Sequence, residues 1–188
     1  ALIAGFLNEN PDMTLQTIEG DSTFVKELLM DGKCDIAFLR SESSSVKEFN
    51  SIPYMIDYLT AVLPATHPLA KADNLPFEQL RGETFLLFPE HSFINDLCIR
   101  ECRNAGFEPH IAYTGNRGAT LIDLVRNGAG ITLMMHHSAR QENDSSLAFI
   151  PVTPGIYSYI SLNYAKEKPL SPQAEIFVRY VKAHKRDF

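Results

Sequence analysis

The chain has 188 residues, with 17 basic and 23 acidic side chains, a formal net charge of −6 and a pI near 5.5. A chain of this length buries roughly 70% of the surface that its unfolded form exposes, so it needs no disulfide or metal to fold. No segment carries a dense run of Lys and Arg, and we therefore do not expect these residues to bind nucleic acid well.

The cysteines and the apolar runs indicate the class of protein. Three cysteines form no paired framework, which favours reduced thiols and a cytosolic setting. The longest apolar runs fall far short of the about 20 residues that span a bilayer, so neither a membrane helix nor a signal peptide is expected. Ala1–Leu7 has the pattern of the middle of a helix without a cap. We therefore expect the chain to be cut from a longer one.

The first part of the chain alternates predicted helices and strands. Ser22 is the predicted N-cap of the second helix, because Ser oxygens accept hydrogen bonds from the first helical N–H groups. The polar, Ser-rich residues 41–50 are expected to form a surface loop. In chain order we predict a helix ending by Asn10, a strand at 13–18, a helix from Ser22, and strands at 34–39 and 58–63.

The rest of the chain repeats this alternation. Residues 65–82 include Pro68 and Pro76, which interrupt any long helix, and are expected to form the crossing to a second lobe. The predicted elements that follow are a strand at 85–88, a loop at 89–92, a helix at about 95–105, a strand near 111–113, a turn at 114–118, a helix, strands at 131–135, 147–152 and 157–164, and a final helix after Ser171-Pro172.

One short pattern occurs twice. Glu27–Gly32 and Asp123–Gly128 each end an amphipathic helix at a Gly and lead into a nearly continuous apolar strand. Such strands suit a sheet that helices cover on both faces. The repeat therefore predicts an α/β fold of two similar lobes, residues 1–83 with 158–188 and residues 84–157, and a cleft between them.

Five segments support a more specific assignment. They are Glu19-Gly20-Asp21-Ser22, Gly32-Lys33-Cys34-Asp35-Ile36-Ala37, His67-Pro68-Leu69-Ala70, Ala105-Gly106-Phe107-Glu108-Pro109 and Val125-Arg126-Asn127-Gly128-Ala129-Gly130-Ile131. Each is weak alone, but in this order and spacing they resemble the effector-binding domain of LysR-type transcriptional regulators. The resemblance covers essentially the whole chain.

The resemblance implies fold and partners together. It implies two Rossmann-like lobes joined by a two-pass hinge, as in type II periplasmic binding proteins, with a small metabolite sensed in the interlobe cleft. It also implies a cytoplasmic homodimer, or a tetramer of the full-length protein. Promoter DNA would be bound only through an N-terminal winged helix-turn-helix that this chain lacks, as it lacks the family's first strand. Neither catalysis nor a cofactor is implied.

The candidate effector residues follow from the architecture. Ligands of open α/β sheets lie beyond the carboxyl ends of strands, where helices begin. This rule selects Ser22 and Thr23 before one helix and Thr114, Gly115 and Asn116 before another. Helix N-termini favour anions, so a carboxylate or a similar group is expected.

Side chains near these turns complete the expected site. Arg40 is either a bidentate partner for a carboxylate or a solvated residue at a loop edge, and Arg117 has the same two interpretations. Pro89, His91 and Ser92 lie in the loop after the first strand of the second lobe, where a plain surface role is the alternative. Ser22 likewise serves either as a helix cap alone or as an effector contact.

Metal binding and catalysis are the remaining alternatives. Cys98 and Cys102, with His91 upstream, superficially suggest metal ligands, but they share an apolar stripe with Ile94 and Ala105 and are interpreted as core residues. His136-His137 has no ligand neighbour at a suitable spacing, and Asp35 fits a turn better than a general base. A solute-binding protein for transport and a bilobal enzyme stay open as rival functions.

Overall fold

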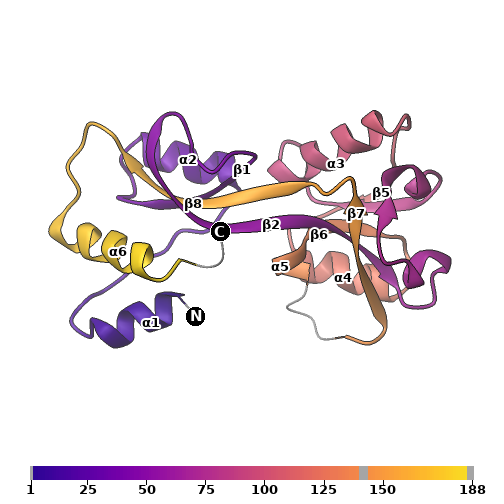
Figure 1. Cartoon of the computed structure of the whole chain (residues 1–188), viewed down its shortest axis with the longest axis horizontal. Helices are drawn as coiled ribbons and strands as arrows, with labels where there is room; N and C mark the ends of the chain where they lie inside the picture. Colours follow the sequence, from indigo (N-terminus) through magenta and orange to yellow (C-terminus); the bar gives the residue numbers. More distant parts are fainter. Residues whose placement is uncertain (1, 140–143, 186–188) are drawn as a thin grey trace. The chain divides into compact units, whose positions relative to one another are not determined.

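The computed structural model describes residues 2–139 and 144–185, which divide into two compact units (Figure 1). Unit 1 contains Ala1–Ile56 and Ser158–Phe188, and unit 2 contains Asp57–Tyr157. The chain passes between them within strand β2 (Phe49–Pro64) and again at the start of strand β8 (Tyr157–Ala165).

Unit 1 packs helices against antiparallel strands. Strand β1 pairs with β8 from Ala37↔Asn163 to Ser41↔Tyr159. Besides parts of β2 and β8, the elements of this unit are helix α1 (Leu2–Glu9), helix α2 (Ser22–Met30), strand β1 (Ala37–Ser41) and helix α6 (Pro172–Ala183).

Two apolar clusters hold unit 1 together. In the first, the fully buried Phe6 of α1 meets Phe177 and Tyr180 of α6, with ring centroids 4.8 and 5.3 Å apart. In the second, Leu29 of α2 packs on Leu39 of β1. The N-terminal helix is thus fastened to the C-terminal one, although the two are far apart in sequence.

Unit 2 is built around short strands connected by helices. Strand β2 pairs antiparallel with β6 and with β7, and β4 pairs parallel with β5. The elements are the 3-10 helices η1 (Pro68–Lys71) and η2 (Phe77–Leu80), the strands β3 (Leu75–Pro76), β4 (Thr84–Leu87), β5 (His110–Thr114), β6 (Thr132–Met135) and β7 (Leu147–Thr153), and the helices α3 (Phe93–Asn104), α4 (Gly118–Arg126) and α5 (His136–Ala139).

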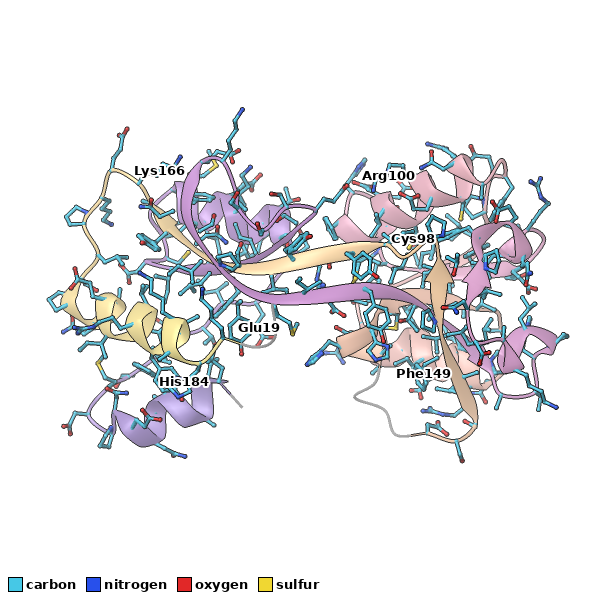
Figure 2. All side chains as sticks on the ribbon, viewed as in Figure 1. Glu19, Cys98, Arg100, Phe149, Lys166 and His184 are labelled. Carbon is cyan, nitrogen blue, oxygen red and sulfur yellow. The ribbon has the colours of Figure 1, made fainter. Side chains whose placement is uncertain are left out.

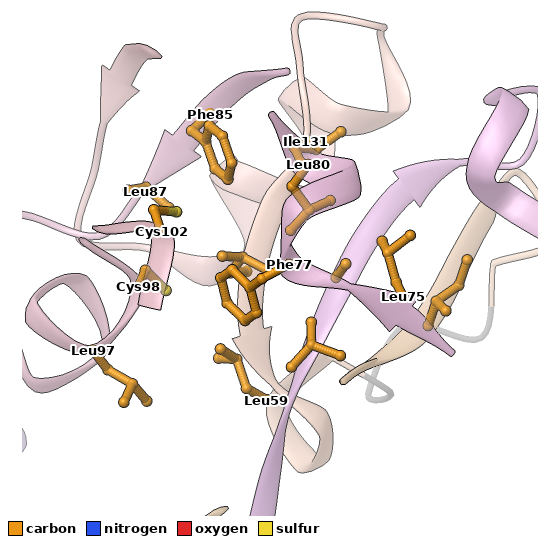
Figure 3. Packing of buried hydrophobic residues seen from close by; sticks show 14 of the residues in the cluster. Leu59, Leu75, Phe77, Leu80, Phe85, Leu87, Leu97, Cys98, Cys102 and Ile131 are labelled. Atoms are coloured by element: carbon orange, nitrogen blue, oxygen red, sulfur yellow. The ribbon is translucent and has the colours of Figure 1, made fainter. Parts of the chain in front are cut away.

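Alternate residues of the central strands of unit 2 enter different apolar clusters. Leu87 of β4 joins the cluster that contains Leu97 and Cys98 of α3 (Figure 3), whereas Leu86 joins the cluster that contains Leu121 of α4. In β6, Leu133 and Met135 similarly join the first cluster, whereas Met134 joins the second. Helices therefore cover both faces of these strands, as their continuous apolar sequences predicted.

The repeated helix ends are confirmed at the level of single hydrogen bonds. Gly32 and Gly128 have φ of 69° and 75°, a left-handed conformation that favours glycine. Lys33 N donates to Leu28 O at 2.9 Å, and Ala129 N donates to Leu124 O at 3.0 Å. Both copies are therefore the same C-terminal capping motif, in which the residue after the Gly bonds back to the helix.

Two local predictions for unit 1 are wrong. Residues 13–18 form no strand: Met13 and Leu15 are half-buried, Ile18 is exposed, and no described strand pairs with this segment. The N-cap of α2 is Asp21, whose Oδ1 accepts from Thr23 N at 2.8 Å and Phe24 N at 3.1 Å, so Ser22 is already the first helical residue. An aspartate carboxylate caps as well as a serine hydroxyl does.

Residues 65–82 belong to unit 2 and do not form the expected crossing between lobes. They contain η1, β3 and η2, and Leu75 and Phe77 are buried in the unit 2 core. His67 caps η1, because its Nδ1 accepts from Leu69 N at 3.2 Å. The second unit accordingly begins at Asp57, within β2, and not at residue 84.

Candidate functional site

The candidate residues of unit 1 meet where β1 ends and α2 begins. Arg40 N donates to Ser22 Oγ at 3.1 Å, and Arg40 Nη1 donates to Ser158 Oγ at 2.6 Å. Ser158 is fully buried and Arg40 is half-buried, so the guanidinium is held in place and is not a loosely solvated side chain. We call Ser22, Arg40 and Ser158 the arginine cluster.

The remaining unit 1 candidate, Thr23, gives its backbone N–H to Asp21 and exposes its side chain. Ser22 differs, because its oxygen accepts from Arg40 while its hydroxyl proton stays available to an acceptor on a ligand. Ser158 was missed by sequence reasoning. It lies 118 positions from Arg40, and no local pattern could have joined the two.

In unit 2, a buried amide organises the loop before α3. Asn95 is 3% exposed, and its Nδ2 donates to Phe88 O at 2.8 Å. Ser92 caps α3 by accepting from Asn95 N at 3.3 Å, and its Oγ donates to Pro89 O at 2.7 Å. His91 has φ of 66°, which is uncommon outside glycine. The Ser92 hydroxyl thus uses its hydrogen bonds within the helix cap. This favours the structural role that was the alternative to effector binding.

The second candidate loop of unit 2 starts beside the first. Leu87 of β4 pairs with Thr114 of the parallel strand β5, so both strands end at the same edge. Gly115 N donates to Leu87 O at 3.0 Å, and a Cβ at position 115 would stand 2.7 Å from the Tyr113 ring. Candidate residues 89–92 and 114–117 are therefore neighbours in unit 2.

Arg117 stands at the N-cap of α4 without any side-chain capping bond. Leu121 N donates to Arg117 O, but the capping side chain that the first turn of a helix ordinarily has is missing here. A cationic side chain at the positive end of a helix is an unfavourable pairing that an anion would relieve. Asn116 precedes it in the same turn.

A third group at this edge was not predicted as a site. The segment of β6 lies parallel to β4 through the Phe85↔Ile131 bridge, and β6 ends at Met135, directly before His136, the first residue of α5. The His136 ring stacks on Tyr58 with centroids 4.3 Å apart, and its Nδ1 lies 3.3 Å from Thr60 Oγ1. The His136-His137 pair was visible in the sequence, but its aromatic partner on β2 was not.

A groove of about 760 Å³ also opens on unit 1, between residues 13–20 and the segment leading into β1. Met13, Leu15, Ile36 and Phe38 give it an apolar lining, and none of the arginine cluster lines it. The arginine cluster and this groove are thus separate features of unit 1.

Comparison with known proteins identifies the family of this chain. The family model described as "LysR substrate binding domain" matches residues 1–186. The chain belongs to this family. The resemblance seen in the five sequence segments is thereby confirmed, and so is the α/β fold of the type II periplasmic-binding-protein kind.

Individual relatives of this LysR substrate-binding domain are regulators of transcription. "Transcriptional dual regulator GltC" of Bacillus subtilis is 25% identical over 181 residues, which are 96% of this chain and 60% of the relative. The uncharacterized HTH-type regulator YwbI of the same organism is 27% identical over 97% of this chain and 61% of its own. The chain therefore spans about three fifths of these relatives.

Solved structures show the same fold. The regulatory domain of Synechocystis CcmR, in complex with 2-PG, superposes with a TM-score of 0.88 at 16% identity, covering 99% of this chain and 90% of that one. Full-length CbnR in complex with its target DNA gives 0.79 at 21% identity, covering 99% and 65%. At these identities the likeness establishes the fold alone.

Two of the three cysteines of this LysR domain, Cys98 and Cys102, are core residues, as predicted. Cys98 and Cys102 are fully buried in the cluster of Figure 3. Within residues 2–139 and 144–185, no group of three or more His, Cys, Asp or Glu side chains is placed to hold a metal ion. Nor does any helix in these ranges have the length and apolar character to cross a membrane.

The buried thiols of Cys98 and Cys102 should react slowly with thiol reagents. Burial raises the pKa of Cys98 well above its ordinary value, raises the pKa of Cys102 to about 12, and also raises the pKa of the half-buried Cys34. Because the thiolate is the reactive form, a chromogenic disulfide reagent at about pH 8 should label Cys34 first and the other two only after denaturation. Cys34→Ser should remove the early phase, whereas rapid labelling of all three thiols in the native protein would contradict the prediction.

Proposed function

We propose that this chain is the effector-sensing module of a LysR-type transcriptional regulator, and that the arginine cluster of unit 1 contacts a small anionic metabolite. The observation that carries the proposal is the fixed guanidinium of Arg40, held by Ser158 beside the Ser22 hydroxyl. A guanidinium offers several N–H donors in a planar fork that matches a carboxylate, and a hydroxyl can donate one more bond.

The loops of unit 2 supply the second set of proposed contacts. Thr114, Gly115, Asn116 and Arg117 surround an N-terminus of α4 that lacks a capping side chain, and His91 lies in the adjacent loop. A helix N-terminus contributes about 0.3 to 2 kcal/mol toward an anion, so micromolar affinity, roughly −8 kcal/mol, needs several converging groups. More than one group of each set is therefore expected to contribute.

The proposed mechanism is a shift between conformations. An effector changes assembly only through its difference in affinity between two states of the protein. We propose that the full-length protein is cytoplasmic, assembles as a homodimer or tetramer, and binds promoter DNA through a part outside this chain, as its length relative to GltC suggests. The module is proposed to be non-catalytic, since the relatives are regulators. Absence of turnover of any bound ligand would support this point.

Replacing Ser22 with Ala tests the arginine cluster. We expect effector affinity to fall about tenfold, roughly 1.4 kcal/mol, because a ligand loses one hydrogen bond to the hydroxyl. The free energy of unfolding should fall by at most about 1 kcal/mol, since Asp21 still caps α2. Calorimetric titration should use the best ligand from a thermal-shift screen of small carboxylates, aromatic acids, sugars and 2-PG, the compound bound to the CcmR domain.

Asp21→Ala is the matched control for this measurement. It removes the cap one position away and should lower stability by about 1 kcal/mol while leaving affinity nearly unchanged. Equal losses of affinity in the two variants, or losses of affinity and stability in parallel, would reject a direct contact at Ser22.

A further inference from the structure

A second groove on unit 1 lies apart from the arginine cluster. It has a volume of about 420 Å³ and runs between α6 and the segment that follows β8. We call it the α6 groove. Lys166, labelled in Figure 2, stands in the segment after β8. None of the effector contacts proposed above lines this groove.

The base of the α6 groove is apolar and gives it a fixed form. Val178 is 5% exposed and belongs to the main cluster of unit 1, and Leu170 and Tyr164 pack against that cluster. Glu175, Val178, Arg179 and Lys182 follow the helical spacing that places residues on one face of α6. The charged groups of Glu175, Arg179 and Lys182 are therefore carried by a packed helix.

The charges in the α6 groove are unbalanced. Lys166, Lys168, Arg179 and Lys182 face only two acidic residues, Glu167 and Glu175, in a chain whose overall charge is −6. Cations gathered in one concave surface raise the local concentration of anions. The groove is therefore positively charged although the chain as a whole is negatively charged.

Most of these cations are not neutralised by any residue that the structure describes. In the described part of the chain, Lys168, Arg179 and Lys182 form no ion pair or side-chain hydrogen bond, and Lys166 Nζ donates only to the carbonyl of Lys47, at 2.7 Å. Glu175 stands four residues before Arg179, a spacing that favours an ion pair, yet these two described residues form none. The donors of Arg179 and Lys182 on α6 are thus not used by any other described residue.

We propose that the α6 groove is a second binding site, separate from the effector contacts, for a small polyanion carrying two or more phosphate or carboxylate groups. Two neighbouring cations on α6 and one or two from the segment after β8 would each contact a different anionic group. Its volume lies within the range typical of small-molecule sites. Because such contacts are solvent-exposed, binding should weaken as the salt concentration rises.

The test uses this chain, with inorganic pyrophosphate and citrate as separate probes in calorimetric titrations at low ionic strength. The wild-type chain should bind at least one probe with a dissociation constant at or below about 1 mM. The double variant Arg179→Gln with Lys182→Gln should weaken that binding at least tenfold, about 1.4 kcal/mol. Both positions are exposed and Gln is a good helix former, so the variant should fold, and a melting curve verifies it.

A charge-matched control decides whether the effect is local. Lys26→Gln with Lys71→Gln removes the same charge outside the α6 groove and should leave the dissociation constant within about twofold, because neither side chain lines the groove. The proposal fails if neither probe binds, or if the control weakens binding as much as the groove variant does. A preference for pyrophosphate would identify phosphate groups as the natural partner, and a preference for citrate would identify carboxylates.

Discussion

Replacing Phe6 with Ala is expected to lower the free energy of unfolding of unit 1 by about 3 to 5 kcal/mol. Phe6 is fully buried and meets Phe177 and Tyr180 edge to face. Truncation removes the apolar contact area of the Phe6 ring and leaves a cavity between α1 and α6. The chain has no Trp, so urea unfolding should be followed by far-ultraviolet circular dichroism.

Ile3→Ala on the same helix is the control, because Ile3 is 43% exposed. Its effect should be near that of an ordinary surface substitution, about 0.5 kcal/mol. Hydrogen exchange would assign the loss to a unit, since amides of α6 should lose protection in the Phe6 variant while those of α3 keep theirs. Similar stability losses in both variants would show that α1 does not depend on the Phe6 contact.

The elements that sequence predicted well are those whose signal is local. The helices ending at Gly32 and Gly128 were recognisable because a left-handed cap and an apolar stripe lie within a few residues. The continuous apolar sequence of β6 likewise indicated burial on both faces, which the structure confirms. In each case the physical cause and its pattern lie in the same short segment.

Predictions failed where a distant partner decides the structure. Residues 13–18 have strand alternation, but a strand also needs a neighbour that accepts its hydrogen bonds. Residues 65–82 have the composition of a linker because of Pro68 and Pro76, yet both prolines lie at 3-10 helix starts whose apolar residues enter the unit 2 core. The composition of this segment predicted where regular structure is interrupted, but not that its apolar residues are buried.

The sequence likewise predicted the candidate site only in part. The turn rule selected Ser22, and Arg40 was selected separately as a possible partner for a carboxylate; the structure joins the two through a hydrogen bond from Arg40 N to Ser22 Oγ. Ser158 and Asn95 escaped because each acts through a carbonyl or guanidinium that the sequence does not place beside it. Whether the selected residues bind an effector remains a prediction that the Ser22 variant tests.

Replacing Gly130 with Ala should strongly destabilise unit 2, because the added methyl group meets the backbone of a neighbouring strand. A Cβ at position 130 would stand 2.4 Å from the carbonyl oxygen of Thr84, which already accepts from Ile131 N at 2.8 Å. Turning a side chain cannot relieve a clash with backbone, so β4 and β6 must separate. We expect a loss of about 3 kcal/mol, the upper end of the usual cost of overpacking.

Gly128→Ala, two residues away, separates this steric cause from backbone strain. Gly128 has φ of 75° but no atom within 4 Å of an added Cβ, so only the left-handed conformation penalises Ala, by about 1 to 2 kcal/mol. Urea unfolding of both variants should therefore rank Gly130→Ala as the more damaging. A reversed order would mean that β4 and β6 can move apart freely. In that case their ends could not hold the loops at residues 88–92 and His136 in register, and the candidate contacts of unit 2 would lose their rigid support.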